Sequence, residues 1–281
     1  MNYISKEFKK DFPEHFSCKN NYSANRVLYQ YQELKDEYLG TIYDKKLFLS
    51  NPNNFNDPFD CWGAIDINAV LQLESEELAR FLFKFGKGNY SVNSILEVNK
   101  NAPKQLQQLI SGFDKHMNKV IGEYLNCSCF TSSWDNELMW SHYADKHRGI
   151  CVGFDISNWK SFEGYQFGPV QYKNQKPINL LELFNNDLSK FTQKTAHQLI
   201  LTKNPDWHYE KEWRLVTPKL ANNKIPLNNL GLSVKEIIFG FAISLESAME
   251  QKRLFVDKGI NIDFYKIKLS DNISRLQKVA I

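Results

Sequence analysis

Short apolar runs bounded by turn-forming residues predict strands along most of the chain. Two of them lie near the start, at 26–31 and 46–50, and a loop rich in asparagine, proline and aspartate follows at 51–60. The later runs predict strands at 127–133, 149–155, 169–172, 212–216, 234–239 and 260–267.

Apolar residues change to a helical spacing between about 68 and 126. The clearest stripe comprises Leu106, Leu109, Ile110, Phe113, Met117, Val120, Ile121 and Tyr124. The spacing predicts an inserted helical segment with one buried face. Further helices are predicted at 137–144, 180–201 and 245–257, the last with Ser244 as its N-cap.

The order of these elements indicates the fold class. The strands come mostly late and do not alternate strictly with helices, which favours an α+β fold over a doubly wound sheet. With 281 residues, 42% of them hydrophobic and 14% aromatic, the chain is long enough to bury a substantial core. We expect a single domain, 1–281, with a helical insertion at about 68–126.

Charge and hydropathy exclude several classes of protein. Charged residues make up 24% of the chain, but the net charge is only +3, too small a field to indicate nucleic acid or a membrane as partner. No apolar run approaches the ~20 residues that span a bilayer, and the first residues lack the hydrophobic core of a signal peptide. We therefore expect a cytoplasmic protein with no membrane association.

The cysteines and histidines give little support for a metal site. The five cysteines have no Cys-x-x-Cys spacing, so we expect reduced core residues rather than disulfides or zinc ligands. His142 and Asp145 lie three residues apart on a predicted helix, but a third ligand is lacking. We expect no metal and a structural role for His142, with metal-dependent nuclease chemistry through His142, Asp145 and His147 as a weaker alternative.

Glu210 and Glu212 are the most informative pair of polar residues. If they lie on one strand, both carboxylates point to the same face, and their repulsion raises the proton affinity of one of them. Such a pair suits chemistry that develops positive charge, such as cleavage of a glycosidic bond through an oxocarbenium-like state. The alternative is a solvated strand edge whose glutamates pair with lysines.

Three segments resemble the signature strands of the mono-ADP-ribosyltransferase fold, in the same order. They are Leu28-Tyr-Gln-Tyr31, Cys129-Phe-Thr-Ser-Ser133 and Tyr209-Glu-Lys-Glu-Trp213. The resemblance implies two packed β-sheets that form a cleft, with NAD as co-substrate. Longer segments, among them Leu138-Met-Trp-Ser-His-Tyr-Ala-Asp145, resemble a large bacterial family, domain of unknown function 2971.

The transferase resemblance implies roles for individual residues. Glu212 would be the catalytic glutamate, Glu210 would orient or activate the acceptor, and Thr131, with Ser132 as the alternative, would support Glu212 by a hydrogen bond. The nucleotide would contact a further set of residues: Tyr29, Gln30, Tyr31, Ser132, His142, Tyr143 and Arg148. Independently of the resemblance, we expect the loop at 55–60 to lie near this site, because a proline-braced loop can hold polar groups in place. Such an enzyme would transfer ADP-ribose to a protein, a nucleic acid or a nucleotide, as toxins and phage-defence proteins do.

The sequence departs from the transferase pattern at Gln30. The pattern has arginine or histidine there, and a neutral amide does not bind a pyrophosphate as a guanidinium does. Arg148 or Arg214 would then supply the missing charge. Gln30 weakens the case for NAD and favours a non-catalytic or differently catalytic module on the same fold that binds a nucleotide or a nucleic acid. An NAD glycohydrolase is a further alternative on this fold.

Overall fold

The computed structural model describes residues 27–61, 117–162, 164–174, 198–270 and 276–281, with parts of 65–80, 108–115 and 178–196. The chain divides into two compact units. The first comprises 1–50, 126–170 and 206–281, and the second comprises 51–125 and 171–205.

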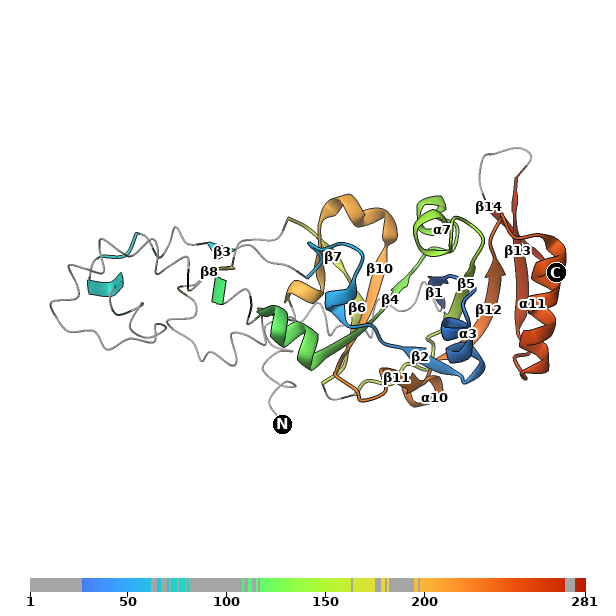
Figure 1. The fold of residues 1–281 in the computed structure, drawn as a ribbon, viewed down its shortest axis with the longest axis horizontal. Coiled ribbons are helices and arrows are strands. Elements are labelled where there is room, and N and C mark those ends of the chain that lie inside the picture. The colour runs from blue at the N-terminus through green and yellow to red at the C-terminus, as the bar shows by residue number, and fades with distance from the viewer. Residues whose placement is uncertain are drawn as a thin grey trace. The chain divides into compact units, whose positions relative to one another are not determined.

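An eight-stranded sheet forms the centre of the first unit (Figure 1). Its strand order is β14-β13-β12-β5-β1-β4-β10-β6. The bounds are β1 (Val27–Gln32), β4 (Leu125–Thr131), β5 (Ile150–Asp155), β6 (Gln166–Pro169), β10 (Glu212–Pro218), β12 (Ser233–Phe239), β13 (Asp263–Leu269) and β14 (Leu276–Ala280). β12 and β13 run parallel, and the connection between them contains the helix α11 (Leu245–Asp257), as a parallel crossover requires.

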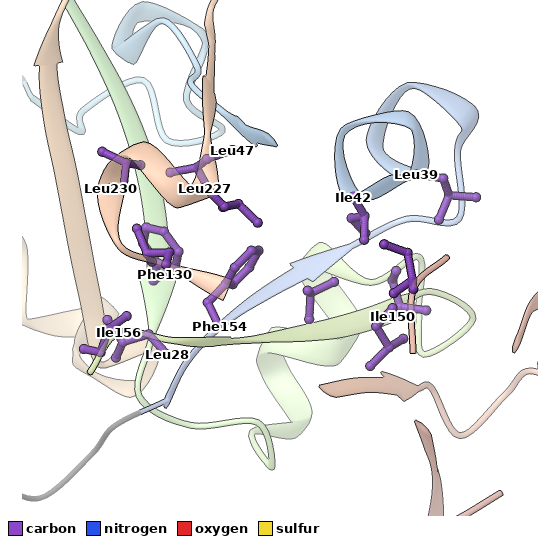
Figure 2. Packing of buried hydrophobic residues seen from close by; sticks show 14 of the residues in the cluster. Leu28, Leu39, Ile42, Leu47, Phe130, Ile150, Phe154, Ile156, Leu227 and Leu230 are labelled. Carbon is purple, nitrogen blue, oxygen red and sulfur yellow. The ribbon is translucent and has the colours of Figure 1, made fainter. Parts of the chain in front are cut away.

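Apolar side chains from one face of this sheet form the larger core. Leu28 of β1, Phe130 of β4 and Phe154 of β5 belong to it (Figure 2). Three helices contribute to the same core: α3 (Asp36–Tyr43) through Leu39 and Ile42, α10 (Leu227–Leu230) through Leu227 and Leu230, and α11 through Ala248 and Phe255.

The opposite face of the sheet packs against α7 (Glu137–Tyr143). The smaller core there contains Tyr29 and Tyr31 of β1 together with Met139 and Trp140 of α7. Because side chains alternate along a strand, Tyr29 and Leu28 belong to different cores. The two faces of the sheet therefore differ: one is mainly aliphatic and phenylalanine-rich, and the other carries tyrosines and tryptophans.

The helix α11 begins as the sequence predicts. Ser244 has extended backbone angles, and its hydroxyl accepts a hydrogen bond from the Ser247 amide at 3.0 Å. Ala248 and Phe255, seven residues apart, lie on the buried side of the helix.

Outside the large sheet, the first unit also contains a two-stranded ladder, in which β2 (Lys46–Phe48) pairs with β11 (Lys224–Pro226).

In the second unit, β3 (Ile65–Asp66) pairs with β8 (Ile178–Asn179), and β7 (Gln171–Tyr172) pairs with β9 (Thr202–Lys203).

The asparagine-rich start of the 51–60 loop caps a helix of the second unit. Residues 117–124 are helical, and the side-chain amides of Asn51 and Asn53 donate to the carbonyls of Gly122 and Asn118, at 3.0 and 3.2 Å. A Cβ at Gly122 would lie 2.2 Å from the Asn53 amide nitrogen, so a larger residue there would displace the Asn53 side chain from its present position. The loop itself contains the 3-10 turn η1 (Pro52–Asn54).

The mixed α+β class is confirmed, as are most predicted strands and the helices at 137–144 and 245–257. The strand predicted at 169–172 is wrong as one element, because β6 ends at Pro169 and β7 pairs in a different ladder. Most of the predicted insertion at 68–126 and of the helix at 180–201 lies outside the described residues. Within the described ranges, eight strands form one sheet and every other ladder has two strands. No described helix is long and apolar enough to cross a bilayer.

Candidate functional site

The three signature segments come together in the sheet. β1, β4 and β10 are consecutive neighbours, although about a hundred residues separate β1 from β4 along the chain (Figure 1). Tyr29 of β1 is in register with Thr131 of β4. At the end of β4, the Ser132 amide donates to the Lys211 carbonyl at 3.3 Å. The junction before β10 therefore lies beside the polar end of β4.

Alternation along the strands assigns the key side chains to faces of the sheet. Thr131 lies opposite Tyr29, which belongs to the smaller core on the α7 face. Along β10, Trp213 and Leu215 pack with the larger core, so Glu212 and Arg214 point to the other side. Thr131, Tyr29 and Glu212 consequently share the α7 face of three adjacent strands.

Glu210 and Glu212 do not lie on one strand, so that expectation is wrong. The 3-10 turn η2 (Pro205–Glu210) ends at Glu210, and β10 begins at Glu212. Between them Lys211 has a left-handed backbone, with φ of 46°, which interrupts the alternation. Both glutamates are nevertheless buried, with exposed fractions of 2% and 5%. The alternative of a solvated edge is also wrong.

Arg214 forms an ion pair with Glu212. Its Nε donates to Oε1 at 2.7 Å and its Nη2 donates to Oε2 at 2.9 Å, in a two-point arrangement. Arg214 has no exposed surface, so the pair is removed from water. A buried carboxylate needs such a partner to remain charged, and a planar guanidinium matches its geometry better than lysine does.

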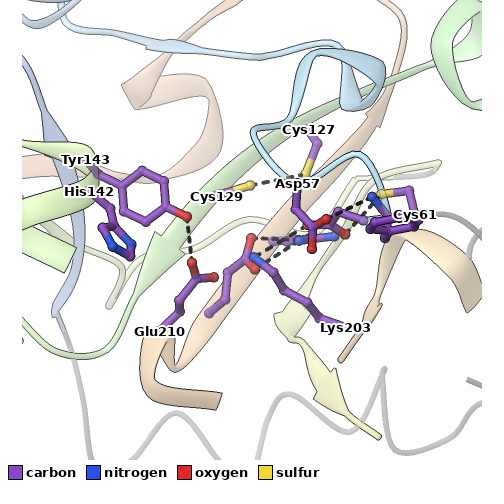
Figure 3. Close-up of polar contacts among 12 residues, drawn as sticks. Asp57, Cys61, Cys127, Cys129, His142, Tyr143, Lys203 and Glu210 are labelled. Atoms are coloured by element: carbon purple, nitrogen blue, oxygen red, sulfur yellow. Dashed lines mark hydrogen bonds and ion pairs between the residues drawn. The ribbon is translucent and has the colours of Figure 1, made fainter. Parts of the chain in front are cut away.

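Two thiols lie on the same face of β4 as Thr131. The Sγ atoms of Cys127 and Cys129 are 3.9 Å apart (Figure 3). The contact with Cys127, burial and the negative charge of Glu212 raise the pKa of Cys129 well above its usual range, and Arg214 opposes this. These effects keep the thiol protonated and unreactive, as expected for a core cysteine.

Glu210 is held by the helix α7. The Tyr143 hydroxyl donates to Glu210 Oε1 at 2.6 Å (Figure 3). One residue earlier, the Tyr209 carbonyl accepts a hydrogen bond from Nδ2 of Asn136 at 2.7 Å, and the Tyr209 hydroxyl lies 3.4 Å from Nδ1 of His142. Sequence reasoning missed Asn136, although an asparagine directly before a predicted helix is a recognisable N-cap signal.

Tyr29 and Tyr31 are buried, with hydroxyls bonded inside the protein. Tyr29 donates to Glu236 Oε1 at 2.9 Å, and Tyr31 donates to the Ser133 carbonyl at 3.0 Å. Burial, the largest cause, raises the pKa of both phenols far above the ordinary value. Contact with a nucleotide stays a prediction for this pair. In the structure they support the sheet face that carries Thr131.

Gln30 points to the other face of β1 from Tyr29 and Tyr31. Its Nε2 donates to Ser128 Oγ at 2.8 Å and to the Cys129 carbonyl at 2.9 Å. The side chain therefore connects β1 to β4 on the face opposite Glu212. The structure does not bring Gln30 together with the other residues assigned to the nucleotide.

The hydroxyl of Thr131 has a local partner. Its Oγ1 accepts from the Ser133 amide at 3.1 Å, which closes the turn after β4. The predicted support of Glu212 by Thr131 does not appear among the hydrogen bonds of the described residues, and Arg214 bonds both Glu212 oxygens instead.

Arg148 is exposed and paired with Asp145. Its Nη2 lies 2.8 Å from Oδ1, and its Nε lies 3.1 Å from Oδ2. The hydrogen bond and charge of Arg148 lower the pKa of Asp145. Asp145, Lys146 and His147 all have left-handed backbones, with φ of 44°, 52° and 68°. This turn reverses the chain between α7 and β5, and Arg148 stabilises it.

The 55–60 loop belongs to the second unit, where it forms an ordered turn. The Asp57 carboxylate accepts from the Phe59 amide at 2.9 Å, which forms an Asx turn. Asp60 forms a buried ion pair with Lys203 of β9 at 3.5 Å, a contact that the sequence does not indicate. The proximity of this loop to the glutamates stays a prediction.

One family model matches part of the chain. The sequence model of a family described as "Protein of unknown function (DUF2971)" matches residues 139–215, from α7 into β10. This match supports the family resemblance seen in the sequence segments and contains Tyr143, Glu210 and Glu212. No curated protein and no solved structure gives a significant match. Among the described residues, no three His, Cys, Asp or Glu side chains are grouped as metal ligands.

Proposed function

We propose that the chain is an enzyme of the ADP-ribosyltransferase type, which cleaves the nicotinamide–ribose bond of NAD and transfers ADP-ribose to a macromolecule or a nucleotide. The proposal includes the cleft-forming fold of that class and a role as a toxin or phage-defence effector. The observation that carries it is the adjacency of β1, β4 and β10, which brings the three signature segments to one part of the sheet.

Two carboxylates with different surroundings supply the chemistry. Nicotinamide leaves with the bonding electron pair, and the ribose becomes an oxocarbenium-like cation that a nearby carboxylate stabilises. Glu212, buried and ion-paired with Arg214 at 2.7 Å, is suited to that task. The acceptor hydroxyl or amine then bonds to the anomeric carbon and loses a proton, which Glu210 accepts as general base.

The experiment incubates the purified protein with NAD, with and without cell lysate and nucleic acid. Released nicotinamide and incorporated ADP-ribose are measured for the wild type and for Glu212→Gln and Glu210→Gln. An exposed carboxylate, Glu246 on α11, supplies the control Glu246→Gln. Nicotinamide release that disappears in Glu212→Gln, and ADP-ribose incorporation that disappears in Glu210→Gln, support the proposal if both persist in the control. Incorporation distinguishes transfer from hydrolysis.

A folding defect in Glu212→Gln would imitate a catalytic one, because the change removes a negative charge that is paired with the buried Arg214. Circular dichroism and the melting temperature of each variant address this. If folded wild type releases no nicotinamide and NAD does not raise its melting temperature, the NAD proposal is wrong. A rise in melting temperature without nicotinamide release favours the binding module.

A further inference from the structure

We infer that Tyr143 is a positioning residue for Glu210, and that α7 serves to hold the Glu210 carboxylate in one orientation. The inference rests on the proposed function, in which Glu210 accepts the acceptor's proton. It gives Tyr143 a role different from the nucleotide contact that the resemblance implies.

The first observation is the short contact itself. The Tyr143 hydroxyl lies 2.6 Å from Glu210 Oε1, within the range of a charge-assisted O–H···O bond. Glu210 is almost fully buried, whereas Tyr143 is half-buried at the end of its helix. A phenol donates to an ionised carboxylate and thereby favours the ionised form over the protonated one. A general base must be in that form.

The second observation is that α7 contacts two consecutive residues through one side of the helix. Asn136, the N-cap, bonds the Tyr209 carbonyl, and Tyr143, seven residues later, bonds the Glu210 side chain. Seven residues are close to two helical turns, so both groups project from the same side. The helix α7 with its N-cap therefore fixes both the backbone at Tyr209 and the side chain of Glu210.

The third observation is the anchoring of α7. Met139 and Trp140 are buried in the smaller core, and the Trp140 indole donates to the Trp134 carbonyl at 2.8 Å. The Asn136 side chain accepts from the Leu138 and Met139 amides, at 2.9 and 3.2 Å. The helix is therefore held to the sheet independently of its contact with Glu210, which is the condition for a positioning element.

The test compares Tyr143→Phe with Tyr43→Phe, a matched loss of a hydroxyl on α3, where the Tyr43 ring packs against Phe255. We expect Tyr143→Phe to lower kcat by about tenfold to a hundredfold, part of the ~10²–10⁴ that a general base contributes. KM for NAD should change little, and the acid limb of the pH–rate profile should move to higher pH. Tyr43→Phe should have the same kcat, KM and pH–rate profile as the wild type.

A second measurement does not depend on turnover. Unfolding free energies of Tyr143→Phe, Glu210→Gln and the double variant form a cycle, and direct bonding predicts that the two single effects are not additive. Additive effects, or a Tyr143→Phe enzyme with unchanged kcat and pH profile, would overturn the inference while leaving the proposed function intact. A wild type without nicotinamide release would overturn both, even if the cycle shows coupling.

Discussion

Arg214 donates hydrogen bonds to both carboxylate oxygens of Glu212 from two residues along the same strand. The pair lies on the α7 face of β10, next to the strand that carries Thr131. A buried ion pair of this kind contributes little net stability compared with apolar residues, but the loss of one partner is costly because the other charge stays buried. This asymmetry favours a specific use for Glu212.

Removal of the Arg214 charge should strongly destabilise the first unit. We expect Arg214→Leu to lower the free energy of unfolding by about 3–5 kcal/mol, and the double change with Glu212→Leu to recover part of this loss. Urea unfolding followed by circular dichroism measures both. Arg253→Leu, at an exposed position of α11, is the control and should change stability by less than about 0.5 kcal/mol. A similarly small effect at Arg214 would contradict the pairing.

Two substitutions of Asn136 should separate its two contacts. Asn136→Asp keeps an oxygen for the Leu138 and Met139 amides but loses the donor to the Tyr209 carbonyl, whereas Asn136→Ala loses both. The alanine variant should lose about 1 kcal/mol of stability more than the aspartate variant, the usual value of an N-cap. If positioning of residues 209–210 matters, nicotinamide release should fall in both. Ser244→Ala on α11 should lose a cap without loss of activity.

Tyr31 should make the protein sensitive to alkaline pH. Burial raises the pKa of the Tyr31 phenol in the folded state far above its ordinary value of about 10. Between pH 10 and the raised pKa, the folded state keeps the Tyr31 phenol protonated, whereas the unfolded state releases the proton. The free energy of unfolding, which is unaffected below about pH 10, therefore falls as the pH rises. The slope should reach about 1.4 kcal/mol per pH unit for this one group. Urea unfolding from pH 8 to 11 measures the free energy of unfolding of the wild type and of Tyr31→Phe. The value for the wild type minus that for the variant should fall above pH 10, and a constant difference would contradict the prediction.

Lys278 should stabilise β14, the last strand of the chain, against local unfolding. Its ammonium lies 2.7 Å from each oxygen of the buried Glu236, and 4.7 and 5.3 Å from the ring centroids of Tyr265 and Trp134. Because Lys278 is partly exposed, we expect Lys278→Met to lower the free energy of unfolding by about 2 kcal/mol. This is less than the effect of removing one partner from a fully buried ion pair. Hydrogen exchange of the β14 amides should quicken in this variant, while exchange in β1 and β5 should be unchanged. Uniform acceleration would indicate general destabilisation instead.

The sequence by itself determined most of the elements and the identity of the chemical groups. Short apolar runs predicted β1, β5 and β12, and a serine followed by an amphipathic stretch predicted α11, because these signals depend on residues close together along the chain. The motif segments also singled out Glu210 and Glu212 as the candidate carboxylates. Local patterns are sufficient for such inferences.

Only the tertiary structure decided how those groups are paired. The left-handed Lys211 separates Glu210 from β10, an effect of one backbone angle that no spacing rule reveals. Gln30 and Tyr29 lie on opposite faces of β1, because successive side chains of a strand point to different sides of the sheet. The Tyr143–Glu210 bond joins residues 67 positions apart. Such long-range contacts depend on the packing of α7 against the sheet, which the sequence does not specify locally.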